Sequence, residues 1–134
     1  MSSKPLVIVT RKLPESIETR MMELFNTKLS VNDNPLSVKE LKEVVANADI
    51  LVPTVTDKID KNILEASSDN LKLIANFGNG IDHIDIEYAL GNKIIVTNTP
   101  GVLTEDTADM VMSLLLAVPR KIIEGEKLIR SGNW

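Results

Sequence analysis

The residues best suited to chemistry form one short segment, Asn76-Phe77-Gly78-Asn79-Gly80-Ile81-Asp82. Two glycines flank an asparagine here, directly after an apolar run that predicts a strand. Glycine adopts positive φ freely and asparagine tolerates it, so such a loop can aim successive backbone N–H groups at one point. A concave group of N–H donors binds anions. The segment predicts a site for a small carboxylate or a phosphate; a tight turn without a ligand remains the alternative.

This loop lacks the pattern that binds dinucleotides. The six residues from Gly78 to His83 have no third glycine of GxGxxG, and they follow the fourth predicted strand rather than the first. The turn after the first strand, residues 10–14, contains no glycine. We therefore expect no tight binding of NAD by this chain.

Other candidate residues are weaker. His83 is the only histidine, so no Ser-His pair or metal cluster can be built around a second one, and we predict no metal site. A structural role for His83 is favoured over catalysis, and nearby Asp82 and Asp85 are expected to raise its pKa. Asp57 follows the third predicted strand too late for a receiver-type phosphoacceptor.

The elements that must position the loop alternate between strand and helix. Apolar, β-branched runs predict five strands, at 6–9, 28–31, 50–52, 71–77 and 94–97. Helical spacing predicts helices between them, at 15–25, 38–45, 59–66 and 84–90. This alternation predicts an α/β fold with a doubly wound, five-stranded parallel sheet. We expect the flavodoxin-like strand order 2-1-3-4-5.

Composition limits the possible partners. The 134 residues carry a net charge of −4 with no basic stripe, which argues against nucleic acid. No apolar run is long enough for a membrane span or a signal peptide, and there is no cysteine. A cytoplasmic location fits these observations.

A second segment begins after Pro100-Gly101. We expect residues 1–101 to form the flavodoxin-like domain and residues 102–134 a long helix, capped by Thr104 and ended by Gly132. Pro119 lies inside this helix and predicts a kink or a break, giving two helices in line.

The long helix is apolar on several faces. Val111, Leu115 and Val118 lie on one stripe, while Met112 and Leu116 lie on others. A helix that is apolar all round must be covered all round. We therefore expect a homodimer through residues 104–130, or a covering domain; one more core helix of a single domain is the alternative.

The chain resembles the D-isomer-specific 2-hydroxyacid dehydrogenases, particularly the glyoxylate and hydroxypyruvate reductase branch. Three stretches carry the resemblance: residues 76–85, 96–109, and 114–120 followed by Arg130-Ser131-Gly132-Asn133-Trp134. The resemblance implies an oxidoreductase that reduces a 2-oxoacid with NADH or NADPH, or runs the reverse. It also implies a crossover helix that leads into a Rossmann domain and pairs in a homodimer.

The resemblance also implies site residues. Backbone amides at Asn79 and Gly80, with Gly78 beside them, would grip the substrate carboxylate. Val55 would line the pocket for the variable group of the substrate. Asn79 and Thr104 would lie near the NAD or NADP cofactor of the complete enzyme.

The family's substrate-binding arginine, its histidine acid/base and its assisting acidic residue have no counterpart here, because the sequence stops before the Rossmann GxGxxG. We therefore assign no catalytic residue, and His83 is not given the histidine role. The fragment alone is expected to be inactive. A non-enzymatic carboxylate-binding or dimerisation module is the alternative function.

Overall fold

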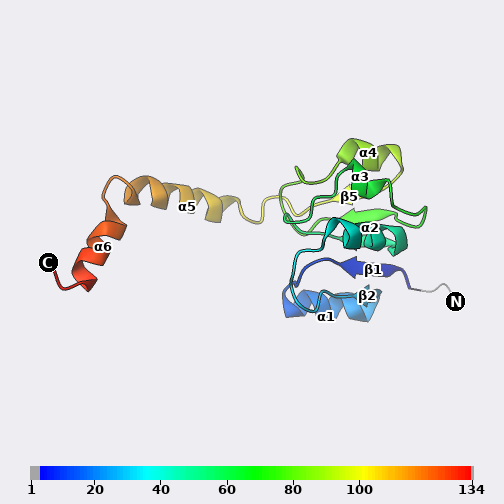
Figure 1. Cartoon of the computed structure of the whole chain (residues 1–134), viewed down its shortest axis with the longest axis horizontal. Coiled ribbons are helices and arrows are strands. Elements are labelled where there is room, and N and C mark those ends of the chain that lie inside the picture. The colour runs from blue at the N-terminus through cyan, green and yellow to red at the C-terminus, as the bar shows by residue number, and fades with distance from the viewer. Residues whose placement is uncertain (1–3, 134) are drawn as a thin grey trace. The chain divides into compact units, whose positions relative to one another are not determined.

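A five-stranded parallel sheet forms the centre of the first of two compact units. The computed structural model describes residues 4–133, and its units divide between Pro100 and Gly101 (Figure 1). The strands pair in the order β2-β1-β3-β4-β5, which confirms the predicted order. Their bounds are β1 Leu6–Val9, β2 Asn26–Lys28, β3 Ile50–Val52, β4 Leu73–Ala75 and β5 Ile95–Thr97.

Helices cover both faces of the sheet. Between the strands lie α1 Glu15–Leu24, α2 Val38–Asn47, α3 Lys61–Leu64 and α4 Ile86–Gly91 (Figure 1). Alternate residues of β1 point to opposite faces: Ile8 packs with residues of α2, α3 and α4, whereas Val7 and Val9 pack with residues of α1. Three consecutive residues of β1 are therefore buried, as expected for a strand covered on both sides.

Local chemistry fixes the start of α2. The Ser37 hydroxyl accepts from the Glu40 amide (3.3 Å), and the Glu40 carboxylate accepts from the Ser37 amide (2.7 Å). This reciprocal pair satisfies two N–H groups that a helix start leaves free. The hydrogen bonds from Ser37 also lower the pKa of Glu40.

The second unit contains two helices, so the predicted break at Pro119 is present, but the two helices do not form one long helix over 104–130. Helix α5 covers Thr104–Ala117 and α6 covers Ile122–Arg130. Pro119 lies in the intervening turn, because its ring cannot donate a helical hydrogen bond and clashes with the preceding turn. Lys121 takes a positive φ of 50°, and α6 turns away from α5 rather than continuing in line (Figure 1).

The ends of these helices partly match the expectation. Thr104 is the first residue of α5, and its predecessor Leu103 makes no side-chain cap, so Thr104 is not the predicted cap. Gly132 follows α6 with a φ of 72°, as predicted for a helix end. No helix within residues 4–133 is both long and apolar enough to cross a bilayer.

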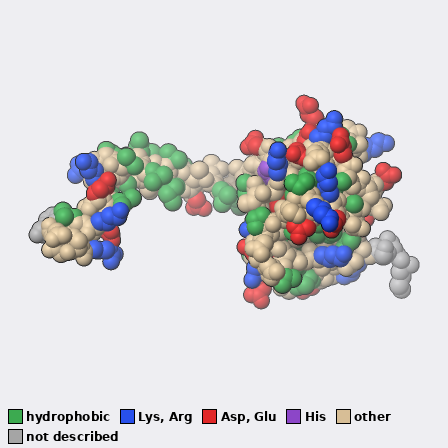
Figure 2. Space-filling model, in the orientation of Figure 1, with side chains coloured by type: hydrophobic (Ala, Val, Ile, Leu, Met, Phe, Trp, Pro, Cys, Tyr) green, Lys and Arg blue, Asp and Glu red, His purple; other side chains and the backbone are tan. Residues whose placement is uncertain are grey.

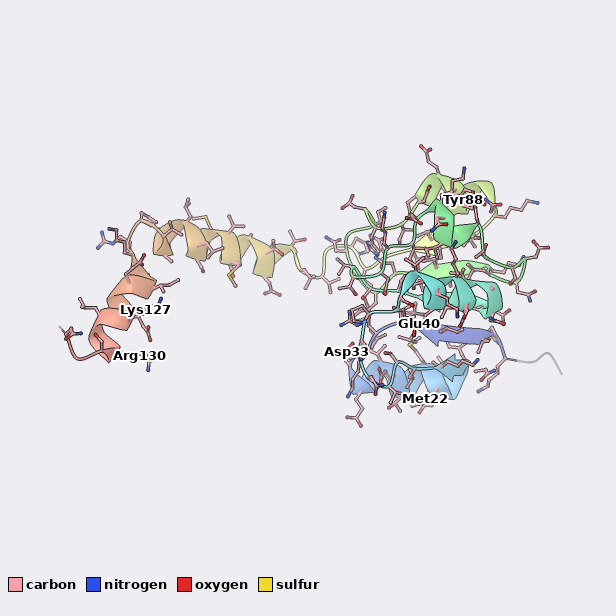
Figure 3. The ribbon with its side chains drawn as sticks, in the orientation of Figure 1. Met22, Asp33, Glu40, Tyr88, Lys127 and Arg130 are labelled. Atoms are coloured by element: carbon pink, nitrogen blue, oxygen red, sulfur yellow. The ribbon has the colours of Figure 1, made fainter. Side chains whose placement is uncertain are left out.

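Apolar side chains of the second unit stay exposed (Figure 2). On α5 the exposed fractions are 61% for Met110, 63% for Leu115 and 64% for Leu116. Charge follows the helix dipole on α6, where Lys127 and Arg130 occupy the last turn (Figure 3).

Candidate functional site

Two loops adjoin at the carboxyl ends of β3 and β4. The Phe77 amide donates to the Pro53 carbonyl (2.9 Å), and the Ile59 amide donates to the His83 carbonyl (2.8 Å). These bonds lie at either end of the loops that contain Val55 and the Gly78-Asn79-Gly80 segment. The structure therefore brings these predicted substrate-binding residues to one edge of the sheet, where open parallel sheets bind ligands.

The Asn76 side chain sits inside the glycine loop and is only 2% exposed. Its Nδ2 donates to the carbonyl oxygens of Gly78 (3.1 Å) and Gly80 (2.9 Å). Only an amide nitrogen can donate to two carbonyls, so its Oδ1 is the acceptor that faces His83 Nε2 at 3.0 Å. His83 consequently carries a hydrogen on Nε2.

The carbonyls of Gly78, Asn79 and Gly80 are each held from within the fold. Besides the two bonds from Asn76, the Asn98 Nδ2 donates to the Asn79 carbonyl (2.7 Å), and the Thr99 amide donates to the Gly78 carbonyl (3.0 Å). In a trans peptide, N–H and C=O point in opposite directions. The amides that follow these carbonyls therefore point away from their anchors.

We use "cradle" for the backbone N–H groups of Asn79, Gly80 and Ile81. Within residues 4–133, none of the three donates to a protein acceptor, and all three residues are exposed. Three neighbouring donors without partners suit an anionic oxygen ligand. Asn79 and Gly80 are predicted site residues, whereas Ile81 joins them only in the structure.

Positive φ does not shape this loop, contrary to expectation. The glycines with positive φ among the described residues are Gly101 and Gly132, not Gly78 or Gly80. Gly78 serves a different need, since a Cβ there would lie 3.3 Å from Asn76 Nδ2. That distance is tighter than an ordinary contact, so a side chain at position 78 would press on the amide that anchors the loop.

The Val55 loop is held by its neighbours on both sides. The Thr54 and Thr56 hydroxyls lie 3.0 Å apart, and Arg11 Nη1 donates to the Thr56 hydroxyl (2.8 Å). Val55, between them, is 69% exposed. An exposed apolar side chain on an anchored loop next to the cradle suits contact with an apolar substituent of a ligand.

Asp57 ties the carboxyl ends of β1 and β3 together. Its Oδ2 accepts from the Thr10 hydroxyl (2.5 Å) and from the Thr54 amide (2.8 Å), while its Oδ1 is buried without a partner in the described part of the chain. At 2% exposure this carboxylate faces inward. It braces the Val55 loop rather than presenting an accessible phosphoacceptor.

Burial lowers the pKa of His83. Loss of solvation outweighs the opposing charges of Asp57 and Asp82, so the expectation of a raised pKa is wrong in its net direction. His83 is therefore neutral at neutral pH and acts as a donor to Asn76. Among residues 4–133, no group of three His, Asp or Glu side chains is arranged to hold a metal ion.

Two residues of the site received no role from the sequence. Asn76 and Asn98 lie at the carboxyl ends of β4 and β5 and anchor three loop carbonyls between them. Asn76 stands two residues before the Gly78-Asn79-Gly80 segment, and this position was the signal in the sequence that could have identified it. Thr104 lies in the second unit at the start of α5, and its cofactor role stays a prediction.

Comparison with known proteins identifies the family. Residues 7–124 match the catalytic domain of the D-isomer specific 2-hydroxyacid dehydrogenases. The chain belongs to this family. The cradle therefore lies at an edge of the sheet of a 2-hydroxyacid dehydrogenase catalytic domain.

Similar proteins of this dehydrogenase family include reductases. A glyoxylate reductase from Thermococcus litoralis is 44% identical over 131 residues, covering 98% of this chain and 39% of the relative. A structure from Thermus thermophilus is 42% identical with a TM-score of 0.83, covering 96% of this chain and 41% of that one. An NADPH-dependent glyoxylate/hydroxypyruvate reductase from Sinorhizobium meliloti, solved with NADP and malonate, is 30% identical with a TM-score of 0.79, covering 98% and 40%. The chain thus spans about two fifths of the length of these relatives.

The lowered pKa of His83 predicts a pH dependence of stability. The unfolded chain takes up the proton more readily, so the contribution of neutral His83 is complete above the ordinary value of 6.5 and is lost as pH falls through the folded pKa. We expect Tm to decline over this range, and less so in His83→Gln, which keeps a donor but does not titrate. An NMR titration of His83 with a midpoint at or above 6.5 would contradict this prediction.

Proposed function

We propose that this chain is the substrate-binding part of an NAD(P)-dependent D-2-hydroxyacid dehydrogenase that reduces a small 2-oxoacid of the glyoxylate or hydroxypyruvate type. The observation that carries the proposal is the cradle, whose three N–H groups have no acceptor among residues 4–133. Such donors form strong, charge-assisted hydrogen bonds with a carboxylate. The similar reductases and the malonate bound to the Sinorhizobium meliloti enzyme support this ligand class.

The residues of this chain would bind and orient the substrate. The cradle would hold the carboxylate, and Val55 would contact the substituent on the carbon that bears the oxo group. Fixing these two ends leaves the oxo carbon in one orientation, which lowers the entropy cost of a later reaction step. The Asn79 side chain and Thr104 are our candidates for contacts with the cofactor.

Asn79 and Thr104 would supply only single contacts to the cofactor, because the sequence has no loop that would bind a dinucleotide by itself. NAD(P), when bound in the complete enzyme, supplies the hydride that reduces the oxo carbon. A dinucleotide loop needs glycines directly after the first strand, and residues 10–14 have none. His83 uses its Nε2 hydrogen in the bond to Asn76, which gives it a structural role in this loop. We therefore assign substrate binding to this chain and hydride transfer to a separate nucleotide-binding domain.

Ligand titration tests the binding role. We expect oxalate to shift the NMR amide signals of Gly78, Asn79, Gly80 and Ile81 in a saturable way, because the cradle takes a carboxylate. Oxamide, a neutral molecule of similar shape, is the matched control and should shift them little. If oxalate moved these signals no more than oxamide does, the proposed function would be wrong.

Activity measurements test whether substrate binding and hydride transfer belong to separate domains. We expect no consumption of NADPH when glyoxylate is mixed with the 134-residue chain alone, and activity when a separately made nucleotide-binding domain of the family is added. The loss of absorbance of NADPH reports both mixtures. Turnover by the chain alone would overturn the assignment, and the nucleotide-binding domain without this chain is the control.

We further propose a homodimer through α5 and α6. Exposed apolar side chains cover these helices, and a groove between them is lined by Leu114, Val118, Ile122 and Ile123. Contiguous apolar surface of this kind marks an interface with another protein. A second copy of the chain is the occupant we expect, because it presents the same apolar surface in return.

Sedimentation equilibrium at micromolar protein concentration tests the dimer. We expect a dimer for the natural sequence and a monomer for Leu115→Glu, since a buried unpaired charge destabilises an interface. Lys42→Glu on α2 changes charge outside the second unit and should leave the dimer intact. A folded monomer of the natural sequence, shown by the same measurement, would exclude this interface.

A further inference from the structure

The direction of each cradle N–H is set by the carbonyl of the same peptide. The carbonyls concerned belong to Gly78, Asn79 and Gly80, which precede Asn79, Gly80 and Ile81. Because N–H and C=O of a trans peptide are opposed, holding the oxygen on one side holds the hydrogen on the other. The side chains that bind these oxygens therefore control the donors without touching the ligand.

The three carbonyls are anchored unequally. The Gly78 oxygen has two donors, Asn76 Nδ2 at 3.1 Å and the Thr99 amide at 3.0 Å. Among the described residues, the Asn79 oxygen depends on Asn98 Nδ2 alone (2.7 Å), and the Gly80 oxygen depends on Asn76 Nδ2 alone (2.9 Å). Removal of one asparagine should therefore release one particular peptide.

Asn76 is itself held on three sides. Its backbone amide donates to the Thr97 carbonyl (2.9 Å), its side chain is buried, and its Oδ1 accepts from His83 Nε2. Both hydrogens of Nδ2 are used by the loop, so rotation of the amide would break three bonds at once. His83 thus keeps the donor end of Asn76 turned toward the loop.

We propose that Asn76 and Asn98 are positioning residues that aim the cradle, with His83 holding Asn76 in place. Asn98 sets the Gly80 N–H and Asn76 sets the Ile81 N–H, while the Asn79 N–H is secured twice, by Asn76 and by Thr99. The loop is pre-formed by bonds from the ends of β4 and β5, so the ligand need not order it. The meaning of this arrangement for catalysis rests on the proposed function, but the direction of the N–H groups does not.

Residual dipolar couplings of the ligand-free chain test the positioning directly, because they report the direction of each N–H vector. In Asn98→Ala, a change at an exposed side chain, we expect the Gly80 coupling to change while that of Ile81 stays. In Asn76→Ala we expect the Ile81 coupling to change most and that of Asn79 less. Asn92→Ala, which removes a similar side-chain bond to the Tyr88 carbonyl outside the loop, should change neither.

Oxalate affinity provides the second measurement. Loss of one charge-assisted hydrogen bond should raise the dissociation constant about tenfold in Asn98→Ala, with no change in Asn92→Ala. Unchanged couplings at Gly80 and Ile81 in both variants would overturn the inference, whether or not oxalate binds. If the couplings change as expected but the natural chain does not bind oxalate, the positioning holds and the proposed function fails.

Asn98→Ala also serves as a control for folding, because Asn98 is exposed and its replacement should leave the first unit folded. Asn76 is buried, so Asn76→Ala can weaken the first unit, and couplings in β1 to β5 must match those of the natural chain before its loop is compared. His83→Gln offers a milder change, because glutamine retains an N–H donor for Asn76 Oδ1. We expect the Ile81 coupling to be kept in His83→Gln and altered in His83→Ala; equal loss or equal retention in the two variants would contradict the role given to His83.

Discussion

Parallel pairing of all five strands is the constraint on which the site depends. In a parallel sheet every strand delivers its carboxyl end to the same edge. The loops after β3, β4 and β5, which begin near Pro53, Asn76 and Asn98, therefore meet although they lie far apart in the sequence. An antiparallel β4 would send its loop to the opposite edge and separate the cradle from Val55. The parallel direction of the strands thus determines that the loops meet at one edge, whatever residues the loops contain.

Buried polar groups at this edge are stabilised unequally. Asn76 uses both side-chain hydrogens and its oxygen, so its burial leaves nothing unsatisfied. Asp57 satisfies Oδ2 through Thr10 and Thr54 but leaves Oδ1 buried without a partner in the described residues. The same loss of water keeps His83 neutral. One interior environment therefore favours a neutral amide network beneath the cradle and makes a charged histidine there unfavourable.

The sequence predicted the arrangement of elements better than the details of the loop. Apolar runs such as Leu6–Val9 located the strands, because burial on both faces leaves a strong pattern. The second strand lies at Asn26–Lys28 instead of 28–31, since a short edge strand carries little apolar signal. Gly78 does not adopt the positive φ expected of it but provides space beside Asn76. The direction of a loop carbonyl depends on contacts between residues far apart in the sequence. The roles of Asn76 and Asn98 could therefore not be predicted from the local sequence pattern.

The bonds that shape the cradle all come from the first unit. Asn76, Asn98 and Thr99 lie within it, and so do the residues that brace Val55. In the proposed function, carboxylate binding therefore needs no contribution from α5 or α6, whose exposed apolar surface we assign to association instead. Separating these two tasks has a physical advantage, since a loop anchored by its own sheet keeps its geometry when neighbouring domains move. The proposed hydride transfer would use such movement to admit and release ligands, whereas the carboxylate would need a fixed point from which the oxo carbon is oriented.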